Sequence, residues 1–126
     1  MASQPARVLI VDDDAATRQL FAANLEAKGL VVLEATDGLH GLEQARLQQP
    51  DLVVTDIKMP LLDGFELAAA LRRDKRTREI PFIFHSGETT AENEARARRL
   101  GAIAFLTKPL DPAVLAALVT GALGQG

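Results

Sequence analysis

The sequence predicts an α/β fold in which a parallel sheet is covered by helices on both faces. Five short apolar runs alternate along the chain with five longer segments of helical character. Each run is apolar throughout rather than alternately apolar and polar, as expected for a strand that is buried on both faces. Strands that alternate with helices are joined by right-handed crossovers and form a parallel sheet.

The apolar runs define the predicted strands, and turn residues or charged residues bound each run. The first run stops at three consecutive aspartates, and the third stops at Asp56. Polar residues therefore follow the carboxyl ends of two strands directly. The predicted strands are residues 8–11, 31–33, 52–55, 81–86 and 103–106.

Capping residues and breakers define the first four predicted helices. Gly29 is typical of the residue that closes a helix, and Pro50 ends the second one. Two acceptors each precede a glutamate by three residues, at Asp63 and at Thr89, which is the spacing of a capping box. The charged stretch 72–79 is expected to be a solvated linker. The predicted helices are residues 15–28, from 37 to the residue before Pro50, from 63 to about 73, and 89–100.

The last helix begins at Asp111, with Pro112 at its first helical position. No charged residue follows Asp111. We expect the core-facing side to comprise Val114, Leu115, Leu118 and Val119, and the outer side to comprise Ala113, Ala116, Ala117, Thr120 and Gly121. The outer side is small and apolar, and we predict that it contacts a second copy or a partner.

Length and composition predict a single domain over residues 1–126, with a core of about 6–124. The chain has no Cys, which excludes disulfides and cysteine zinc sites. The net charge of −3, with no Trp or Tyr, makes direct nucleic-acid binding an unfavourable hypothesis. No signal sequence or membrane-spanning run is evident, and we expect a cytoplasmic protein.

Chemically active residues follow four of the predicted strands. Asp12 and Asp13 follow the first, Asp56 the third, Ser86 ends the fourth, and Lys108 follows the fifth. Parallel strands bring these residues to one edge of the sheet, where ligands bind in this class of fold. Clustered carboxylates need a cation, and oxygen ligands without His or Cys favour Mg²⁺. Such a site can accept a phosphoryl group, with one carboxylate as nucleophile.

Four segments carry a resemblance to a known family. They are residues 8–14 (VLIVDDD), 55–64 (TDIKMPLLDG), 84–88 (FHSGE) and 101–110 (GAIAFLTKPL). In this order, and over nearly the whole chain, they resemble the receiver domain of two-component response regulators, of the chemotaxis-regulator type. The resemblance implies a doubly wound (βα)5 fold, flavodoxin-like, with strand order 2-1-3-4-5. It also implies transfer of a phosphoryl group from a histidine kinase to an aspartate, with Mg²⁺ required and Mn²⁺ as a substitute.

The resemblance assigns roles to the residues that match the family's motifs. Asp56 would be the phosphoacceptor and a metal ligand. Asp13 would bind Mg²⁺ directly, Asp12 would bind it through water, and the backbone carbonyl of Lys58 would complete the protein ligands. Lys108 would pair with Asp56 and then with the phosphoryl oxygens.

The resemblance also implies a switch. Ser86 matches the switch hydroxyl, and Phe105 matches the aromatic residue that turns inward on activation. The Lys108–Pro109 bond is expected to be cis. The chain departs from the family at His85, where an aliphatic residue is usual, at Gly87, where Ala is usual, and in having Phe rather than Tyr as the aromatic. We expect His85 to be a partly buried structural histidine.

Lys58 and Glu88 each lie two residues beyond a site residue. We expect them to pair across the site mouth and to slow the entry of the water that hydrolyses the phosphoaspartate. The alternative is two independent solvated charges, since exposed pairs contribute little.

The resemblance implies a signalling switch rather than a metabolic enzyme, catalysing only its own phosphorylation and autodephosphorylation. The implied partners are a histidine kinase or histidine phosphotransfer protein and a downstream protein or output domain, with a homodimer through the face of the fourth and fifth helices as a further possibility. The alternative function is a receiver-like module that binds partners without phosphate. An aspartyl phosphatase of the haloacid-dehalogenase type would need a second acid where Lys58 stands, and an FMN carrier would need a phosphate loop where three aspartates stand.

Overall fold

The computed structural model describes residues 4–124, which form five strands and five helices in strict alternation. The predicted fold class is therefore confirmed in its element order. The elements are β1 (Arg7–Val11), α1 (Ala15–Glu26), β2 (Val31–Ala35), α2 (Gly38–Gln48), β3 (Leu52–Asp56), α3 (Gly64–Arg73), β4 (Phe82–Ser86), α4 (Ala91–Leu100), β5 (Ala104–Thr107) and α5 (Pro112–Ala122).

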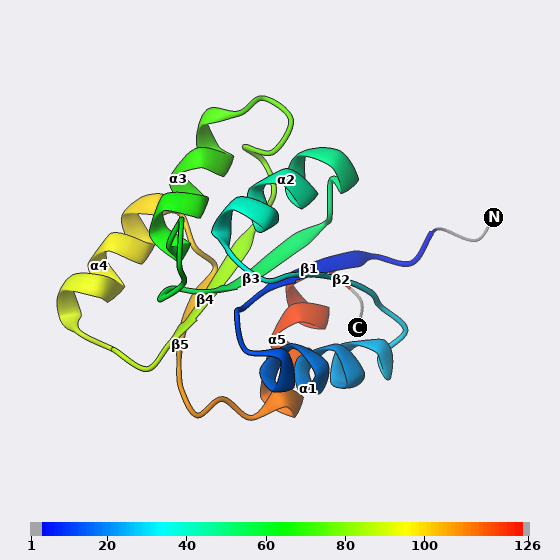
Figure 1. The fold of residues 1–126 in the computed structure, drawn as a ribbon. Coiled ribbons are helices and arrows are strands. Elements are labelled where there is room, and N and C mark those ends of the chain that lie inside the picture. Colours follow the sequence, from blue (N-terminus) through cyan, green and yellow to red (C-terminus); the bar gives the residue numbers. More distant parts are fainter. Residues whose placement is uncertain (1–3, 125–126) are drawn as a thin grey trace.

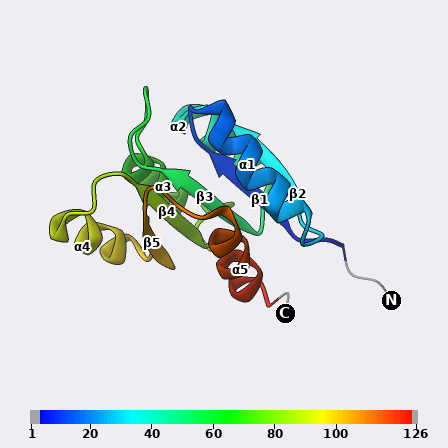
Figure 2. The same cartoon turned by 90° about the horizontal axis from the view of Figure 1, so that it is seen from below.

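The five strands form one parallel sheet in the order β2-β1-β3-β4-β5, as predicted. Helices α2, α3 and α4 cover one face, and α1 and α5 cover the other (Figure 1). The view from below shows α1 and α5 side by side on their face (Figure 2). From β1 the chain first passes to β2 on one side of the sheet and then returns past β1 to β3 on the other side. The switch in strand order therefore lies between β1 and β3.

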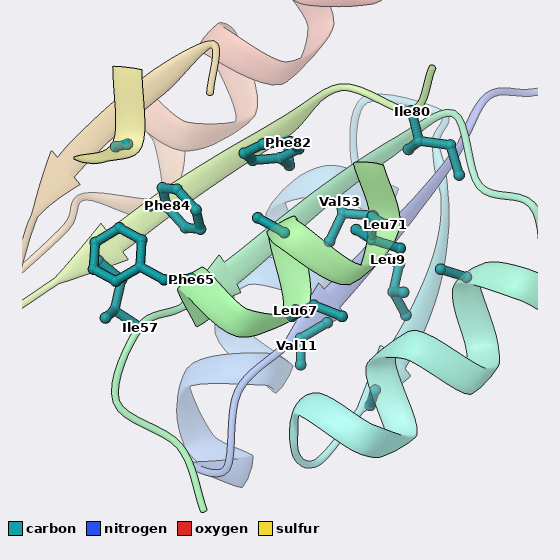
Figure 3. Close-up of a cluster of buried hydrophobic side chains, with 14 residues drawn as sticks. Leu9, Val11, Val53, Ile57, Phe65, Leu67, Leu71, Ile80, Phe82 and Phe84 are labelled. Atoms are coloured by element: carbon teal, nitrogen blue, oxygen red, sulfur yellow. The ribbon is translucent and has the colours of Figure 1, made fainter. Parts of the chain in front are cut away.

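Both faces of the sheet are buried along the three central strands, β1, β3 and β4, whereas the edge strands β2 and β5 are partly exposed. Leu9, Val53 and Phe82 point to the α2–α4 side, where they pack with Leu67 and Phe65 of α3 (Figure 3). The neighbouring residues of the same strands point to the other face and pack against α1 and α5. Continuous apolar strands are thus explained by burial on both faces, as the sequence pattern indicates.

Most helix starts follow the predicted caps. The Asp63 carboxylate accepts from the Glu66 amide, and the Glu66 carboxylate accepts from the Asp63 amide, which completes the capping box. The fourth helix differs from the prediction, because its N-cap is Thr90, which accepts from the Asn93 amide, rather than Thr89. Two adjacent threonines offer the same hydroxyl, so sequence spacing does not separate them.

The stretch between α3 and β4 is less solvated than predicted. Helix α3 extends to Arg73, and Thr77 is completely buried, with its hydroxyl donating to the carbonyl of Leu71. This bond ties the loop to the end of α3 and explains why a polar residue is buried there.

Helix α5 is turned relative to the predicted orientation. Ala116 is buried with Leu115 and Val119, whereas Val114 is 54% exposed. The helix packs against both the sheet and α1, so its buried stripe shifts toward Ala116. The exposed side is consequently more apolar than predicted, because Val114 lies on it.

The predicted domain of residues 1–126 includes five terminal residues that lie outside the described range. Among residues 4–124, no helix combines the length and the apolar character that a membrane crossing requires.

Candidate functional site

The carboxyl ends of the strands bring the predicted site residues to one edge of the sheet. Asp12 follows β1, Asp56 ends β3, and Ser86 ends β4, all three being buried. Lys108 follows β5, and its amide donates to the carbonyl of Ser86 at 2.9 Å. Residues that are far apart in the sequence therefore share one site, as the strand order predicts.

Lys108 and Asp56 form an ion pair at the centre of this site. The Lys108 Nζ donates to Asp56 Oδ2 at 2.8 Å. The other oxygen of Asp56 accepts from the Ile57 amide at 2.7 Å. The Lys108–Pro109 peptide bond is cis, as expected. Both carboxylate oxygens of Asp56 are thus held in place by donors.

Three carboxylates meet beside this pair. Asp12, Asp13 and Asp56 each offer an oxygen, and these oxygens lie within 4.8 Å of one another. Asp12 is 1% exposed, and its Oδ2 is buried without a hydrogen-bond partner among the described residues. Burial raises the pKa of Asp12 to about 6, and the nearby Asp56 charge contributes to the rise. An unpartnered buried oxygen in an acidic cluster fits a hard divalent cation, so these residues form a candidate metal centre.

The two proposed switch residues lie at different depths. Ser86 is buried, and its hydroxyl accepts from the Glu88 amide at 3.0 Å rather than contacting Asp56. Phe105 is half-buried at the margin of the α2–α4 core, opposite Phe84 in the pairing of β4 and β5. A pocket of about 200 Å³ between α4 and β5 is partly lined by Phe105. The switching roles of both residues stay predictions.

Lys58 and Glu88 form the ion pair expected at the mouth of the site. Lys58 Nζ lies 2.5 Å from Glu88 Oε1, although both side chains are largely exposed. The hydrogen bond with Glu88 raises the pKa of Lys58. The pair joins the loop after β3 to the loop after β4. The role of the Lys58 carbonyl as a metal ligand stays a prediction.

An open pocket of about 590 Å³ lies over this mouth, and one of its residues was missed by sequence reasoning. Arg96 of α4 lines the pocket together with Asp13 and Lys58, and its guanidinium lies 4.4 Å over the ring of Phe65.

Gly64 allows the loop after Asp56 to close. A Cβ at position 64 would lie 2.3 Å from the carbonyl oxygen of Asp56, a distance that only glycine avoids. The Gly64 amide also donates to the carbonyl of Ile57 at 2.8 Å. This close approach places the start of α3 against the backbone of Asp56 and Ile57.

His85 is more buried than predicted. It is fully buried, not partly, and its Nε2 lies 3.5 Å from Asp12 Oδ2. Phe21 of α1 packs edge-on against the imidazole, with ring centroids 5.3 Å apart. Burial lowers the pKa of His85 to about 4, so the ring is neutral at neutral pH. The alternation along β4 was the available signal, since Ile83 and His85 share the face that α1 covers.

Comparisons with known proteins agree with this geometry. The family model "Response regulator receiver domain" matches residues 8–120. Protein PilH of Pseudomonas aeruginosa is 37% identical over 118 residues, which cover 94% of this chain and 98% of PilH. The DNA-binding dual master transcriptional regulator RpaA of Synechocystis is 40% identical over 105 residues, and that match covers 83% of this chain but 44% of RpaA.

The fold has close counterparts among solved structures. The chemotaxis protein CheY4 of Vibrio cholerae superposes with a TM-score of 0.87 at 30% identity, and the match covers 94% of this chain and 98% of CheY4. Receiver domains of this family are signalling switches rather than classical enzymes. The sheet order, the acidic cluster and the family match over most of the chain lead to one assignment: the chain belongs to the response regulator receiver domain family.

Proposed function

We propose that Asp56 accepts a phosphoryl group from a phosphohistidine of a histidine kinase or a histidine phosphotransfer protein. The observation that carries the proposal is the Asp56 carboxylate itself, which lies between the Lys108 ammonium and the oxygens of Asp12 and Asp13. An Asp56 oxygen attacks phosphorus, the O–P bond forms, and the P–N bond to the donor imidazole breaks.

The residues that would hold Mg²⁺ are Asp12, Asp13, Asp56 and the carbonyl of Lys58, with Mn²⁺ as a substitute. The bound ion would offset the negative charge of the carboxylates and of the phosphoryl oxygens. Lys108 stays within reach of the same oxygens and contributes a fixed positive charge there. The Ile57 amide orients the carboxylate by binding its other oxygen.

Phosphorylation would then shift the domain between two conformations. In the starting state the Ser86 hydroxyl is bonded within the loop to Glu88. A phosphoryl oxygen on Asp56 offers Ser86 a charged acceptor in place of that loop contact. Phe105 would follow by turning inward, and the face formed by α4, β5 and α5 would change its shape for a downstream partner.

The same face supports the proposal of a homodimer. Val114 on α5 and Ile103 before β5 are large apolar side chains that are 54% and 44% exposed. Helix α5 carries no charged side chain, so little desolvation opposes contact with a second copy.

The test is the intact mass of the protein after incubation with acetyl phosphate and Mg²⁺. We expect one added phosphoryl group, which is lost when a chelator is present and in Asp56→Ala. Glu43→Ala, an exposed carboxylate on α2, serves as the matched control and keeps the adduct. If no adduct forms although calorimetry detects Mg²⁺ binding, and no beryllofluoride complex forms either, the domain is a phosphate-independent binding module.

A further inference from the structure

Positive charge is concentrated at one end of the molecule. We define the basic surface as the cations at the ends of three helices and in the loop from α3 to β4: Arg46, Arg72, Arg73, Lys75, Arg76, Arg78, Arg98 and Arg99. These eight cations share the region with two carboxylates, Asp74 and Glu79, so the region has a net charge of +6. The remainder of the chain has six cations and fifteen carboxylates, a net of −9. The net charge of −3 therefore conceals a strong separation.

The structure joins these segments through Arg72. Its guanidinium donates to the carbonyl of Arg78 at 2.5 Å, to that of Ile80 at 3.1 Å and to that of Leu100 at 3.2 Å. The same group stacks 4.4 Å over the ring of Phe82. Arg72 thus fastens the loop to the end of α4, and Figure 1 shows α3 and α4 side by side. Arg72 therefore has a structural role, because it fixes the relative positions of the segments that carry the other cations.

Most of the remaining cations have no carboxylate to pair with. Asp74 binds Arg46 at 2.9 Å and Arg76 at 3.0 Å. The others are exposed, and none has a carboxylate within ion-pair distance in the range 4–124: Arg73, Lys75, Arg78, Arg98 and Arg99. A surface pocket of about 500 Å³ is lined by Arg46, Arg73, Lys75 and Arg76 around Asp74.

Helix dipoles account for only part of this charge. Cations in the last turn of a helix are stabilised by its carboxyl end, which explains the arginines that end α3 and α4. The loop residues Lys75, Arg76 and Arg78 lie beyond any helix end and gain nothing from it. Asp74 compensates the charge of Arg76, whereas Lys75 and Arg78 have no carboxylate within ion-pair distance among residues 4–124, so a bound anionic partner would relieve the repulsion among these cations.

We propose that the basic surface docks an acidic segment of a partner protein. Asp74, held between Arg46 and Arg76, shows that the cations of this surface are spaced to bind a carboxylate from two sides. A compact acidic segment can cover the free cations without approaching the acidic remainder of the chain.

The other polyanions fit this surface less well. A nucleic acid would extend beyond the basic surface and meet the remainder of the chain, which has a net charge of −9. In addition, each of the five phenylalanines is buried or half-buried, so none is exposed to stack on a base. An anionic membrane gains from a continuous apolar face that inserts, whereas the large apolar side chains exposed beside the basic surface, Leu47 at the end of α2 and Ile103 after α4, lie on separate elements.

The basic surface lies at the other end of the sheet from Asp56. Its loop precedes β4, and the end of α4 precedes β5, whereas the phosphoacceptor site follows the strands. An acidic partner can therefore stay bound while a phosphodonor uses the site. The proposal stands independently of the phosphorylation of Asp56.

The test measures binding of the full chain to a fluorescein-labelled peptide of twelve glutamates by fluorescence anisotropy. We expect binding that weakens strongly between about 50 mM and about 500 mM salt. In the triple variant Arg73→Gln, Lys75→Gln, Arg78→Gln we expect about tenfold weaker binding. The matched control, Lys28→Glu with Gln19→Glu, lowers the net charge by the same amount on exposed positions of another region and should bind as the wild type does.

Two results would overturn the proposal. Equal loss of binding in the patch variant and in the control would mean that only the total charge matters. Tighter binding of a twelve-base-pair DNA duplex, or of phosphatidylglycerol vesicles, with the same dependence on the triple variant would assign the surface to that polyanion instead. Circular dichroism of each variant verifies folding, and no step of the test requires phosphorylation.

Discussion

Asp12 is a buried carboxylate whose ionisation the fold opposes, and this makes the site sensitive to pH. Burial raises its pKa to about 6, and a cation that binds the ionised carboxylate competes with the proton. We expect the Mg²⁺ affinity to be full well above pH 6 and to fall by up to about tenfold per pH unit below it. Calorimetric titration between about pH 7.5 and about pH 5 measures this. In Asp12→Asn the affinity should be weak throughout, and a persisting slope there would contradict the assignment to Asp12.

The same carboxylate should lower the stability of the metal-free protein. The pKa of Asp12 is raised on folding from 3.8 to about 6, so the stability it contributes is present below pH 3.8 and is lost as the pH rises through 6. At neutral pH and without Mg²⁺, the free energy of unfolding of Asp12→Asn, measured by urea denaturation, should therefore exceed that of the wild type by about 1–3 kcal/mol. Added Mg²⁺ should stabilise the wild type but not the variant. Glu43→Gln, on an exposed position, should change neither quantity, and a destabilised Asp12→Asn would contradict the expectation.

The Lys58–Glu88 pair should lengthen the lifetime of a phosphorylated Asp56. The pair bridges the two loops at the site mouth, where a hydrolytic water would enter. Lys58→Ala should shorten the lifetime by about twofold to fivefold, since exposed pairs contribute little. Decay of the phosphorylated mass measures it. Glu88→Ala should act alike, and the double variant should add nothing. An unchanged lifetime in Lys58→Ala would leave the two residues as solvated charges.

For individual residues, the sequence predicts the position of a side chain better when the residue follows a strand than when it lies within one. Asp56 and Lys108 were predicted to meet because both follow strands that share an edge, the family resemblance implied that they pair, and they do pair. The full burial of His85 and its approach to Asp12 were missed. They depend on which side of β4 faces α1, and this requires the alternation of the strand to be combined with the packing of a helix that is distant in sequence.

The elements show where local sequence is sufficient and where packing decides. The strands were found because unbroken apolar runs have few alternatives, and their ends lie within two residues of the predicted ones. Helix α5 was assigned the wrong exposed side, since Ala116 and Val114 are both apolar and only contact with α1 distinguishes them. The caps at Asp63 and Asp111 were correct, because each has a single local acceptor at the helix start.

The start of α3 requires glycine, and this gives a prediction at the level of an element. In Gly64→Ala the new Cβ would lie 2.3 Å from the Asp56 carbonyl and 2.9 Å from Ile57 Cα, so the loop and α3 must move apart. We expect a loss of about 2 kcal/mol or more in the free energy of unfolding, measured by urea denaturation. The control is Gly121→Ala in α5, where a Cβ meets no atom within 4 Å and where Ala should stabilise by up to about 1 kcal/mol. Equal effects at the two positions would contradict the steric argument.

For the whole molecule, the parallel sheet separates three surfaces. The phosphoacceptor site lies beyond the carboxyl ends of the strands, the basic surface lies at the opposite end, and the face of α4, β5 and α5 lies at the β5 edge (Figures 1 and 2). Because Lys108 follows β5 directly and pairs with Asp56, we expect a change at Asp56 to reach that face through a single strand.

This arrangement predicts that activation and self-association are coupled through the α4–β5–α5 face. With Mg²⁺ and beryllofluoride, which imitates a phosphoryl group on Asp56, we expect sedimentation velocity to show a shift toward dimer at high protein concentration. Val114→Lys places a charge on the exposed apolar side of α5 and should keep the protein monomeric while phosphorylation of Asp56 proceeds at the wild-type rate. Leu47→Lys, a substitution of a leucine on α2 that is even more exposed than Val114, is the control and should still dimerise. A strictly monomeric wild type in the activated state would overturn the proposed dimer.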